Sequence, residues 1–271
     1  MKLWLAPLEG VSDCAFRTLC YNHGADLTFT EMIRVDSVLR NNQATIKLMD
    51  LKNDTPTAIQ LLVTKPQALE KFLTLFPTFK LNPVGFNLNL GCPSPDAINQ
   101  GAGAALVKRT QRVQELVKIL KKTELPVSIK IRLGLNQFEK EKKVYLNLIR
   151  DVDADYFIIH PKHARQTSIE RCDWSVYPEC IDTGKHIVAN GDIYAPEHVH
   201  YFKNLGIKEL MLGRAAVINP AIFEHLKEKK SYSLSALKQE YTKLAQNYSS
   251  QDKYRKNTLK YLGKAMEVTN G

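Results

Sequence analysis

A lone cysteine, Cys92, stands in a turn between a predicted strand at residues 84–90 and Pro93. Asn87 and Asn89 share one face of that strand, and apolar residues occupy the other face. In α/β enzymes the reactive groups lie at the carboxyl ends of strands. An unperturbed thiol, with a pKa of about 8.5, is mostly protonated at pH 7 and can donate a proton. Cys92 is therefore a candidate general acid, the alternative being a buried structural cysteine beside a turn.

Short β-like segments alternate with helix-favouring segments such as 104–122 and 139–151. Eight β–α units in the first 230 residues or so predict a (β/α)8 TIM barrel, an α/β fold, with a small all-helical C-terminal appendix. A doubly wound sheet usually has fewer strands and is the weaker alternative. The predicted strands are 3–8, 27–30, 57–62, 84–90, 127–133, 156–160, 186–190 and 209–213.

Polar side chains stand at nearly every predicted strand end, where a barrel has its active face. Burying an unpaired polar group costs roughly 2–7 kcal/mol, so a ring of such groups predicts a polar ligand. Any one of them alone would be an ordinary core residue. From the first strand to the eighth they are Glu9, Glu31, Gln60, Asn89 with Cys92, Lys130 with Arg132, His160, Asn190 with Asp192, and Arg214.

The last two strand ends carry Asn-Gly-Asp at 190–192 and Gly-Arg at 213–214. Barrels often hold a phosphate after strands seven and eight. Glycine lets a backbone approach closely, and Arg214 offers a forked donor to phosphate oxygens. The Gly-x-Gly run at 101–103 is a second candidate anion site, which a tight turn explains equally well.

Lys130 lies on an otherwise apolar strand and has two possible roles. Its ammonium could stabilise an anionic cofactor ring. Its neutral amine could form a Schiff base, as in aldolase-type barrels, if its pKa were depressed. Arg132, two residues further on, would help to depress it.

The composition is that of an ordinary globular protein, with 44% hydrophobic and 24% charged residues among 271. We find no apolar run of roughly 18 residues and no leader pattern, so a cytoplasmic location without membrane contact is the default expectation. The five cysteines form no C-x-x-C pair, which argues against disulfides, zinc and Cys-bound clusters, and we expect no metal. Nothing in the sequence indicates an oligomeric partner.

The formal net charge is +10, and the C-terminal part from Lys227 onward carries ten Lys and Arg against four Asp and Glu. After Lys227 the strand signal ends, and apolar residues from Leu234 to Tyr248 recur at three- and four-residue steps. Ser233 or Ser235 could cap this predicted helix, and a second helix is expected to begin at Leu259. A basic helical appendix indicates nucleic acid as the partner.

The combination of motifs resembles the tRNA-dihydrouridine synthases, flavoenzymes that reduce the 5,6 double bond of uridine in tRNA. The resemblance covers residues 3 to about 225, with the motifs in the family's order. The matching residues are Leu5–Gly10, Thr30–Glu31, Gln60–Leu61, Asn89–Pro93, Gly101–Leu106, Lys130–Arg132, His160, Asn190–Ile193 and Gly213–Arg214.

The resemblance implies an FMN-binding barrel over 1–230 and a basic helical tRNA-binding domain over 231–271, with NADPH as the reductant. It implies that Cys92 gives the proton to C5 of uracil while hydride from reduced FMN reaches C6. It implies substrate contacts by Asn89, Arg132 and Arg165. The implied cofactor contacts are Pro7, Leu8, Glu9, Gln60, Lys130, His160, Asn190, Gly191, Asp192, Gly213 and Arg214.

Two departures from the family pattern concern residues beside the site. Asn87 stands where the family often has Asp, and His160 is followed by a longer segment, 161–165, than the usual His-x-Arg. Lys162, His163 and Arg165 in that segment either contact RNA or form a solvated loop. Two other functions stay open: an aldolase-type barrel enzyme using Lys130 as a Schiff-base amine, and a non-catalytic RNA-binding barrel.

Overall fold

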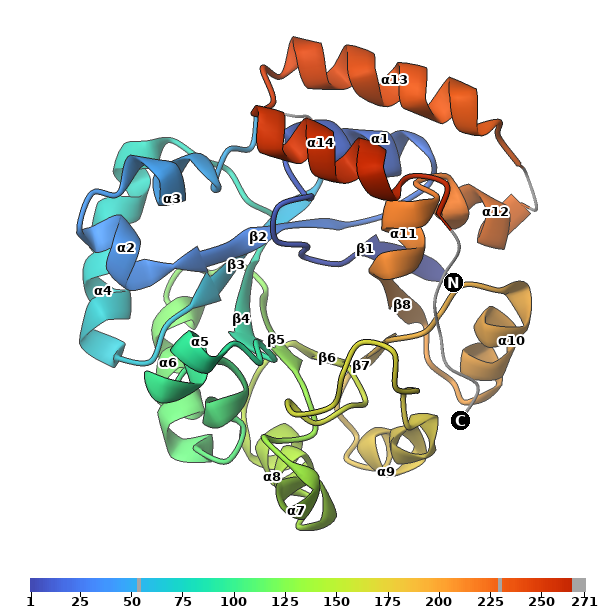
Figure 1. The fold of residues 1–271 in the computed structure, drawn as a ribbon. Helices are drawn as coiled ribbons and strands as arrows, with labels where there is room; N and C mark the ends of the chain where they lie inside the picture. Colours follow the sequence, from blue (N-terminus) through green and yellow to red (C-terminus); the bar gives the residue numbers. More distant parts are fainter. Residues whose placement is uncertain (53–54, 229–230, 265–271) are drawn as a thin grey trace.

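The computed structural model describes residues 1–52, 55–228 and 231–264. Eight strands form one parallel sheet in the order β1-β8-β7-β6-β5-β4-β3-β2 (Figure 1). All eight predicted strands are present. They are β1 Lys2–Leu5, β2 Thr28–Arg34, β3 Thr57–Leu62, β4 Phe86–Leu90, β5 Val127–Ile131, β6 Tyr156–Ile159, β7 Ile187–Asn190 and β8 Glu209–Leu212.

The two strands at the ends of this order are joined by backbone hydrogen bonds. The N–H of Leu5 donates to the carbonyl of Leu27 at 2.8 Å, and the N–H of Asp26 donates to the carbonyl of Leu3 at 2.7 Å. A parallel bridge pairs Trp4 with Leu27. The sheet therefore closes on itself, and the predicted (β/α)8 barrel is confirmed.

Helices surround the barrel, as Figure 1 shows from the end at which the strands finish. Among the described residues they are α1 Cys14–Asn22, α2 Val35–Leu39, α3 Gln43–Lys47, α4 Pro66–Leu75, α5 Pro95–Asn99, α6 Thr110–Lys121, α7 Gln137–Glu141, α8 Val144–Asp151, α9 Tyr177–Ile181, α10 Pro196–Asn204, α11 Arg214–Ile218, α12 Ile222–Glu228, α13 Leu234–Asn247 and α14 Asp252–Tyr261. Short 3-10 turns occur at Phe76–Phe79, Gly103–Leu106 and Trp174–Val176.

Both long helices expected from the sequence are interrupted. Over 104–122 the chain forms a 3-10 turn and then α6, because Arg109 leaves the helical conformation at φ −106° and ψ 55°. Over 139–151 it forms α7 and α8, because Lys143 takes a left-handed conformation at φ 51°. Hydrophobic periodicity continues through such breaks, so it does not reveal them.

The barrel interior is polar toward the carboxyl ends of the strands and apolar toward their amino ends, which we call the lower end. A separate inner cluster fills the lower part, while a larger cluster fills the space between strands and helices. Packed side chains close the barrel below the polar ring, so any ligand must enter from the carboxyl end. The inner cluster consists of Trp4, Ala6, Phe29, Ala58, Ile158, Val188 and Met211.

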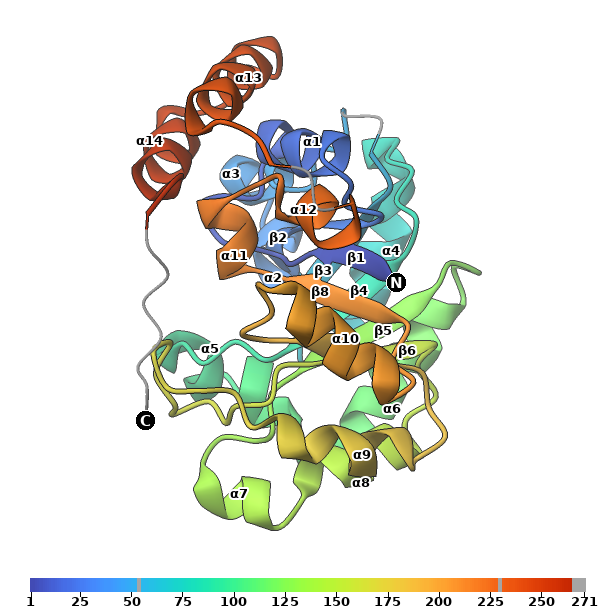
Figure 2. The same cartoon turned by 90° about the vertical axis from the view of Figure 1, so that its right-hand side faces the viewer.

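The two C-terminal helices pack directly against the barrel. Ser233 caps α13 by accepting a hydrogen bond from the Ala236 N–H at 3.1 Å, and the buried Tyr241 joins α13 to the main core. The second helix begins at Asp252, so the expected start at Leu259 is wrong. In Figure 2, α14 lies toward the same end of the barrel as α5 and α11, which follow β4 and β8.

Within residues 1–52, 55–228 and 231–264, the helices are all too short or too polar to cross a membrane.

Candidate functional site

A cavity of about 310 Å³ opens at the carboxyl ends of the strands. It brings together residues from five of the eight strand ends, those of β1, β5, β6, β7 and β8, although they are far apart in the sequence. Ten of the expected site residues line it. They are Pro7, Leu8, Lys130, Arg132, His160, Asn190, Gly191, Asp192, Gly213 and Arg214.

Lys130 extends from β5 into this cavity, on the same face of the strand as the buried Ser128. Its ammonium forms neither a hydrogen bond nor an ion pair with any residue in the described part of the chain. Burial, and to a smaller extent the charge of Arg132, lowers its pKa to about 7. A half-buried lysine without a partner among the described residues favours an anionic ligand in the cavity.

Two further basic residues, His160 and Arg132, lie beside Lys130. Burial and then the nearby positive charges, Lys130 first, hold the pKa of His160 well below its usual range, so its ring is neutral at pH 7. Burial also lowers the pKa of Arg132, whose guanidinium donates to the carbonyl of His163 at 3.1 Å. The β5–β6 side of the cavity therefore combines the Arg132 guanidinium with a neutral His160 ring and with Lys130, whose pKa of about 7 leaves it only partly protonated at neutral pH.

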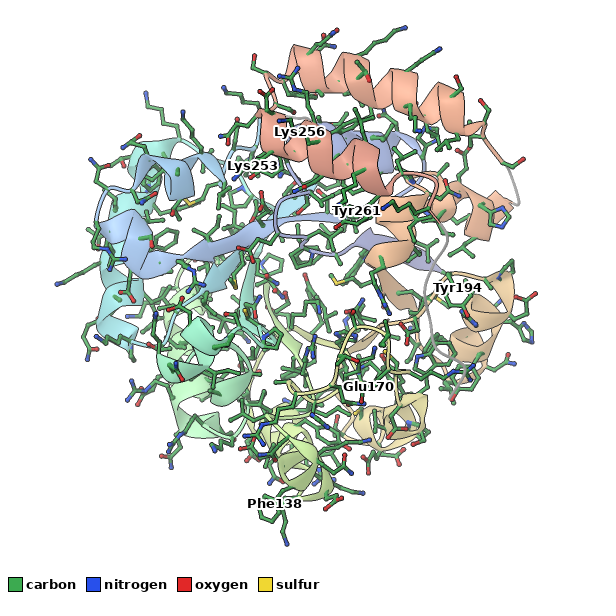
Figure 3. All side chains as sticks on the ribbon, in the orientation of Figure 1. Phe138, Glu170, Tyr194, Lys253, Lys256 and Tyr261 are labelled. Atoms are coloured by element: carbon green, nitrogen blue, oxygen red, sulfur yellow. The ribbon has the colours of Figure 1, made fainter. Side chains whose placement is uncertain are left out.

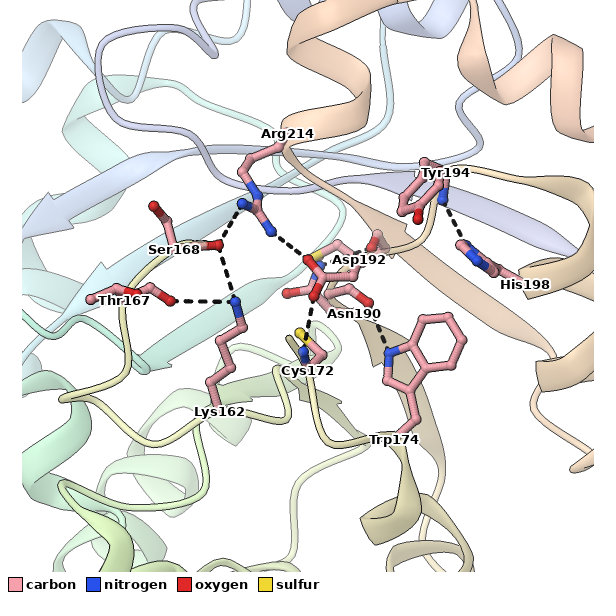
Figure 4. A network of polar contacts seen from close by, with 12 residues as sticks. Lys162, Thr167, Ser168, Cys172, Trp174, Asn190, Asp192, Tyr194, His198 and Arg214 are labelled. Atoms are coloured by element: carbon pink, nitrogen blue, oxygen red, sulfur yellow. Dashed lines mark hydrogen bonds and ion pairs between the residues drawn. The ribbon is translucent and has the colours of Figure 1, made fainter. Parts of the chain in front are cut away.

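The Arg214 side chain is held at the cavity by contacts with two other segments of the chain (Figure 4). Its guanidinium forms an ion pair with Asp192 and donates to the carbonyl of Ser168 at 2.5 Å. Asp192 also accepts from the backbone N–H of Cys172 at 2.9 Å. The loop that follows β6 is thus tied to the ends of β7 and β8.

Lys162 belongs to this network and is almost fully buried, at 1% exposure. Its ammonium donates to the carbonyls of Ser168 and Thr167 at 3.1 and 3.4 Å (Figure 4). This lysine holds the loop from inside and is not exposed at the protein surface. Arg165 is exposed and lies outside the cavity lining, whereas His163 is partly buried.

Glycine at position 191 is required by close packing. A Cβ there would lie 2.5 Å from the Cys172 sulfur and 2.8 Å from the His160 ring, and its φ is +109°. The Trp174 ring nitrogen donates to the Gly191 carbonyl at 3.1 Å, and Asn190 donates to the Met211 carbonyl at 2.8 Å. The backbone at 190–191 consequently forms a fixed wall of the cavity.

Four polar side chains form a hydrogen-bonded chain across β3, β4 and β5. Asn89 donates to Gln60 at 2.8 Å, Gln60 donates to Asn87 at 2.7 Å, and Asn87 donates to Ser128 at 2.8 Å. Each amide thereby satisfies a neighbour inside the barrel. Gln60 and Asn89 lie outside the cavity lining, and Asn87 is a structural member of this chain.

The turn that carries Cys92 is rigid. The Asn89 side-chain oxygen accepts from the N–H groups of Gly91 and Cys92 at 3.0 and 2.8 Å. The N–H of Ala104 donates to the Cys92 carbonyl at 3.1 Å, and the Cys92 thiol donates to Ser94 at 3.4 Å. Cys92 is partly buried and lies outside the cavity lining, but its thiol is near enough to Arg132 to affect the pKa of that residue.

The Gly-x-Gly run at 101–103 serves this turn. Gly103 adopts φ +57° and packs against the backbone of Cys92. It leads into a four-residue 3-10 turn, so the tight-turn interpretation accounts for it.

The sequence interpretation also overlooked residues that contribute to the site. Ser168 and Met211 line the cavity, and Cys172 packs behind Gly191. Lys162, which was considered only as an RNA contact, also lines the cavity. The positions of Ser168 and Cys172 in a long loop carried no local signal. Glu9 is exposed and lines a neighbouring groove. Across the described residues, His, Cys, Asp and Glu side chains form no group of three that could hold a metal ion.

The fold and site together define a (β/α)8 barrel with a cationic ligand cavity at its carboxyl end. Residues 4–270 match the family described as dihydrouridine synthase (Dus), and the chain belongs to that family. The family resemblance inferred from the motifs is therefore confirmed.

Similar sequences include two bacterial proteins described as probable tRNA-dihydrouridine synthases. The one from Treponema pallidum is 27% identical over 240 residues, which cover 84% of this chain and 70% of that protein. The one from Aquifex aeolicus is 29% identical over 232 residues, covering 83% and 72%. A Xenopus tropicalis tRNA-dihydrouridine(47) synthase [NAD(P)(+)]-like protein is 27% identical, covering 87% of this chain but 37% of its own length.

Similar solved structures show the same barrel fold. A 2-naphthoyl-CoA reductase complex has a TM-score of 0.60 at 11% identity and covers 84% of this chain and 50% of its own. A morphinone reductase variant bound to tetrahydroNAD has a TM-score of 0.57 at 9% identity, covering 85% and 87%.

Proposed function

We propose that this protein reduces a uridine in tRNA to 5,6-dihydrouridine, with FMN as its cofactor and NADPH as the reductant. Membership of the family and the names of the relatives support the reaction. The observation that carries the proposal is the cavity itself, which is lined by both Lys130 and Arg214 at one end of the barrel. Lys130 has no partner there in the described part of the chain.

The residues present fit FMN. Arg214 and the close backbone at Gly191 and Gly213 suit the ribityl phosphate. Pro7 and Leu8 offer apolar surface to the ring. The remaining proposed contacts are Glu9, Gln60, Lys130, His160, Asn190 and Asp192.

Bound FMN, once reduced, supplies the hydride that adds to C6 of uracil. The chain's own part is to hold the base and to deliver a proton to C5 from the Cys92 thiol. The hydrogen bonds from Gly91 and Cys92 to Asn89 keep that thiol in one place. A protonated Lys130 stabilises negative charge across the cavity. Asn89, Arg132 and Arg165 contact the substrate.

We assign the catalytic role to residues 1–230 and RNA binding to the basic helical region 231–271. The exposed lysines of α13 and α14 attract the phosphate backbone, and this attraction weakens with salt. Removing the target base from its stack costs a few kcal/mol, which such phosphate contacts offset.

The test compares wild type with Cys92→Ala. The variant should be yellow, retain NADPH oxidation and bind tRNA, yet form dihydrouridine at least a hundredfold more slowly. Cys14→Ala, which removes a thiol that is not part of the cavity lining, is the matched control. Wild-type turnover by Cys92→Ala would exclude the thiol as the proton donor, and a wild-type protein without a flavin spectrum would exclude the proposed reaction.

The low pKa of Lys130 also suits a second candidate, an aldolase-type enzyme that forms a Schiff base. Borohydride reduction in the presence of a carbonyl substrate would then attach that substrate to Lys130 in a colourless protein. A non-catalytic RNA-binding barrel would instead bind tRNA without flavin and without oxidising NADPH.

A further inference from the structure

A second cavity, of about 430 Å³, lies beside the cavity at the carboxyl ends of the strands, which we call the catalytic cavity. The two cavities share Leu8, Ser168 and Arg214. We call it the α14 groove, because the end of α14 forms its outer wall. Val217 and Ile218 of the adjoining helix α11 also line it. A ligand in the catalytic cavity and a ligand in the α14 groove would therefore be neighbours.

The lining of the α14 groove combines an aromatic ring, aliphatic side chains and cations. Tyr261 supplies the ring and is 41% exposed, and Ile169 is 42% exposed. Arg214 and Lys264 supply positive charge against the single acidic lining residue, Glu9, among the described residues. A flat apolar surface beside cations suits a nucleobase and its phosphate.

The surrounding structure fixes the position of Tyr261. The N–H of Gly263 donates to the Ile218 carbonyl at 2.8 Å, which ties the end of α14 to α11. Leu262 is buried in a small cluster with Ala221 and Leu237. Tyr261 is thus exposed and comes directly before two anchored residues, and Figure 3 shows it at the end of α14 nearest α11.

A row of lysines leads along α14 to this ring. Lys253, Lys256, Lys260 and Lys264 follow one another at steps of three, four and four residues, which places them on one side of the helix and its end. All four are exposed, and none pairs with an acid in the part of the chain that the structure describes. The ammonium groups of Lys260 and Lys264 each lie 5.4 Å from the Tyr261 ring centre.

From these features we infer that the α14 groove binds the nucleotide next to the target uridine, with its base stacked on Tyr261 and its phosphate near Lys264. The inference rests on the proposed function, because a uridine in the catalytic cavity belongs to a strand whose next nucleotide must lie close by. The shared wall of the two cavities places that nucleotide in the groove. The lysines along α14 then contact the phosphates of the strand beyond it.

The test measures the affinity of the FMN-loaded protein for UMP and for the dinucleotide UpU by isothermal titration calorimetry. Stacking one base on an aromatic ring should make UpU bind roughly tenfold more tightly than UMP. Tyr261→Ala should abolish this gain without changing the affinity for UMP, and Tyr261→Phe should keep it. Tyr21→Ala is the matched control, because Tyr21 is also 41% exposed but lies on α1 away from the groove.

Three results would overturn the inference: no UpU binding by wild type, equal affinities for UpU and UMP, or a gain that survives Tyr261→Ala. A raised KM for NADPH in Tyr261→Ala, with UpU binding unchanged, would assign the groove to the dinucleotide reductant instead. Failure of the proposed function looks different, because the purified wild-type protein then shows no flavin absorbance, whereas failure of the inference leaves an FMN-loaded protein that binds UpU no more tightly than UMP.

Discussion

Gly103 lies directly against Cys92, so that a Cβ at position 103 would be 2.6 Å from the Cys92 carbonyl oxygen and 3.0 Å from the Cys92 Cβ. The next residue, Ala104, donates its N–H to the same carbonyl. Two motifs that look separate in the sequence, Asn-x-Gly-Cys-Pro and Gly-x-Gly, therefore form one structural unit. The position of the candidate acid depends on a glycine eleven residues away.

Gly103→Ala should displace the Cys92 turn and slow dihydrouridine formation at least tenfold, while the bound FMN is retained. A small displacement of a catalytic group is enough for such a loss. Product formation per bound flavin is the measurement. Gly101→Ala is the control, because position 101 has a similar φ of +69° but no atom within 4 Å of an added Cβ. Equal losses in the two variants would point to backbone strain and not to Cys92.

The low pKa of Lys130 predicts how the stability of the FMN-free protein depends on pH. Burial lowers this pKa to about 7, whereas a lysine in the unfolded chain has a pKa near 10.4. Between these values the unfolded chain binds more protons, so the contribution of Lys130 to stability rises with pH, by at most about 1.4 kcal/mol per unit. Lys130 destabilises the folded protein fully below about pH 7, and this penalty has vanished above about pH 10.4.

Lys130→Met should remove this dependence. Relative to the variant, the Tm of the FMN-free wild type should be lower at pH 7 and should recover between pH 7 and 9. Thermal unfolding at several pH values measures the difference. A constant difference in Tm across this range would contradict the lowered pKa. The same variant should bind FMN more weakly, because an anionic ligand loses its buried partner.

Arg214→Lys should lower the affinity for FMN about tenfold, since a lysine cannot hold Asp192 and also present a second, fixed donor to a phosphate. Fluorescence titration of the FMN-free protein measures the affinity. Arg150→Lys, at an exposed position on α8, should bind FMN as wild type does. Unchanged affinity in Arg214→Lys would remove the arginine from the phosphate site.

Tyr254→Phe should weaken the attachment of α14 to the barrel. The Tyr254 hydroxyl donates to Glu31, which is 3% exposed and otherwise accepts from the Gly10 N–H at 2.6 Å. Loss of that donor leaves a buried carboxyl oxygen unpaired and should cost about 1–3 kcal/mol of unfolding free energy. Urea unfolding is the measurement.

The control for this variant is Tyr261→Phe, which removes an exposed hydroxyl and should leave the unfolding free energy unchanged. Equal stability of Tyr254→Phe and wild type would show that the hydrogen bond to Glu31 contributes nothing to the docking of α14.

The barrel could be predicted because its signals are local. Buried parallel strands appear as short apolar segments, and the chain order of β–α units leaves few alternatives. Polar residues at strand ends, such as Lys130 and Arg214, could then be assigned to one rim from topology alone. The element boundaries were less accurate, since a left-handed residue such as Lys143 ends a helix without disturbing the apolar pattern.

The sequence by itself determined the fold class and the types of side chain at the carboxyl end of the barrel, because both follow from periodicity and chain order. Only the tertiary structure decided which of these side chains find partners. Lys162 turned inward to hold a loop, whereas Lys130 faces the cavity without a partner among the residues that the structure describes. Tyr254 met Glu31 across 223 residues. Such pairings depend on packing between distant segments, about which local sequence carries no information.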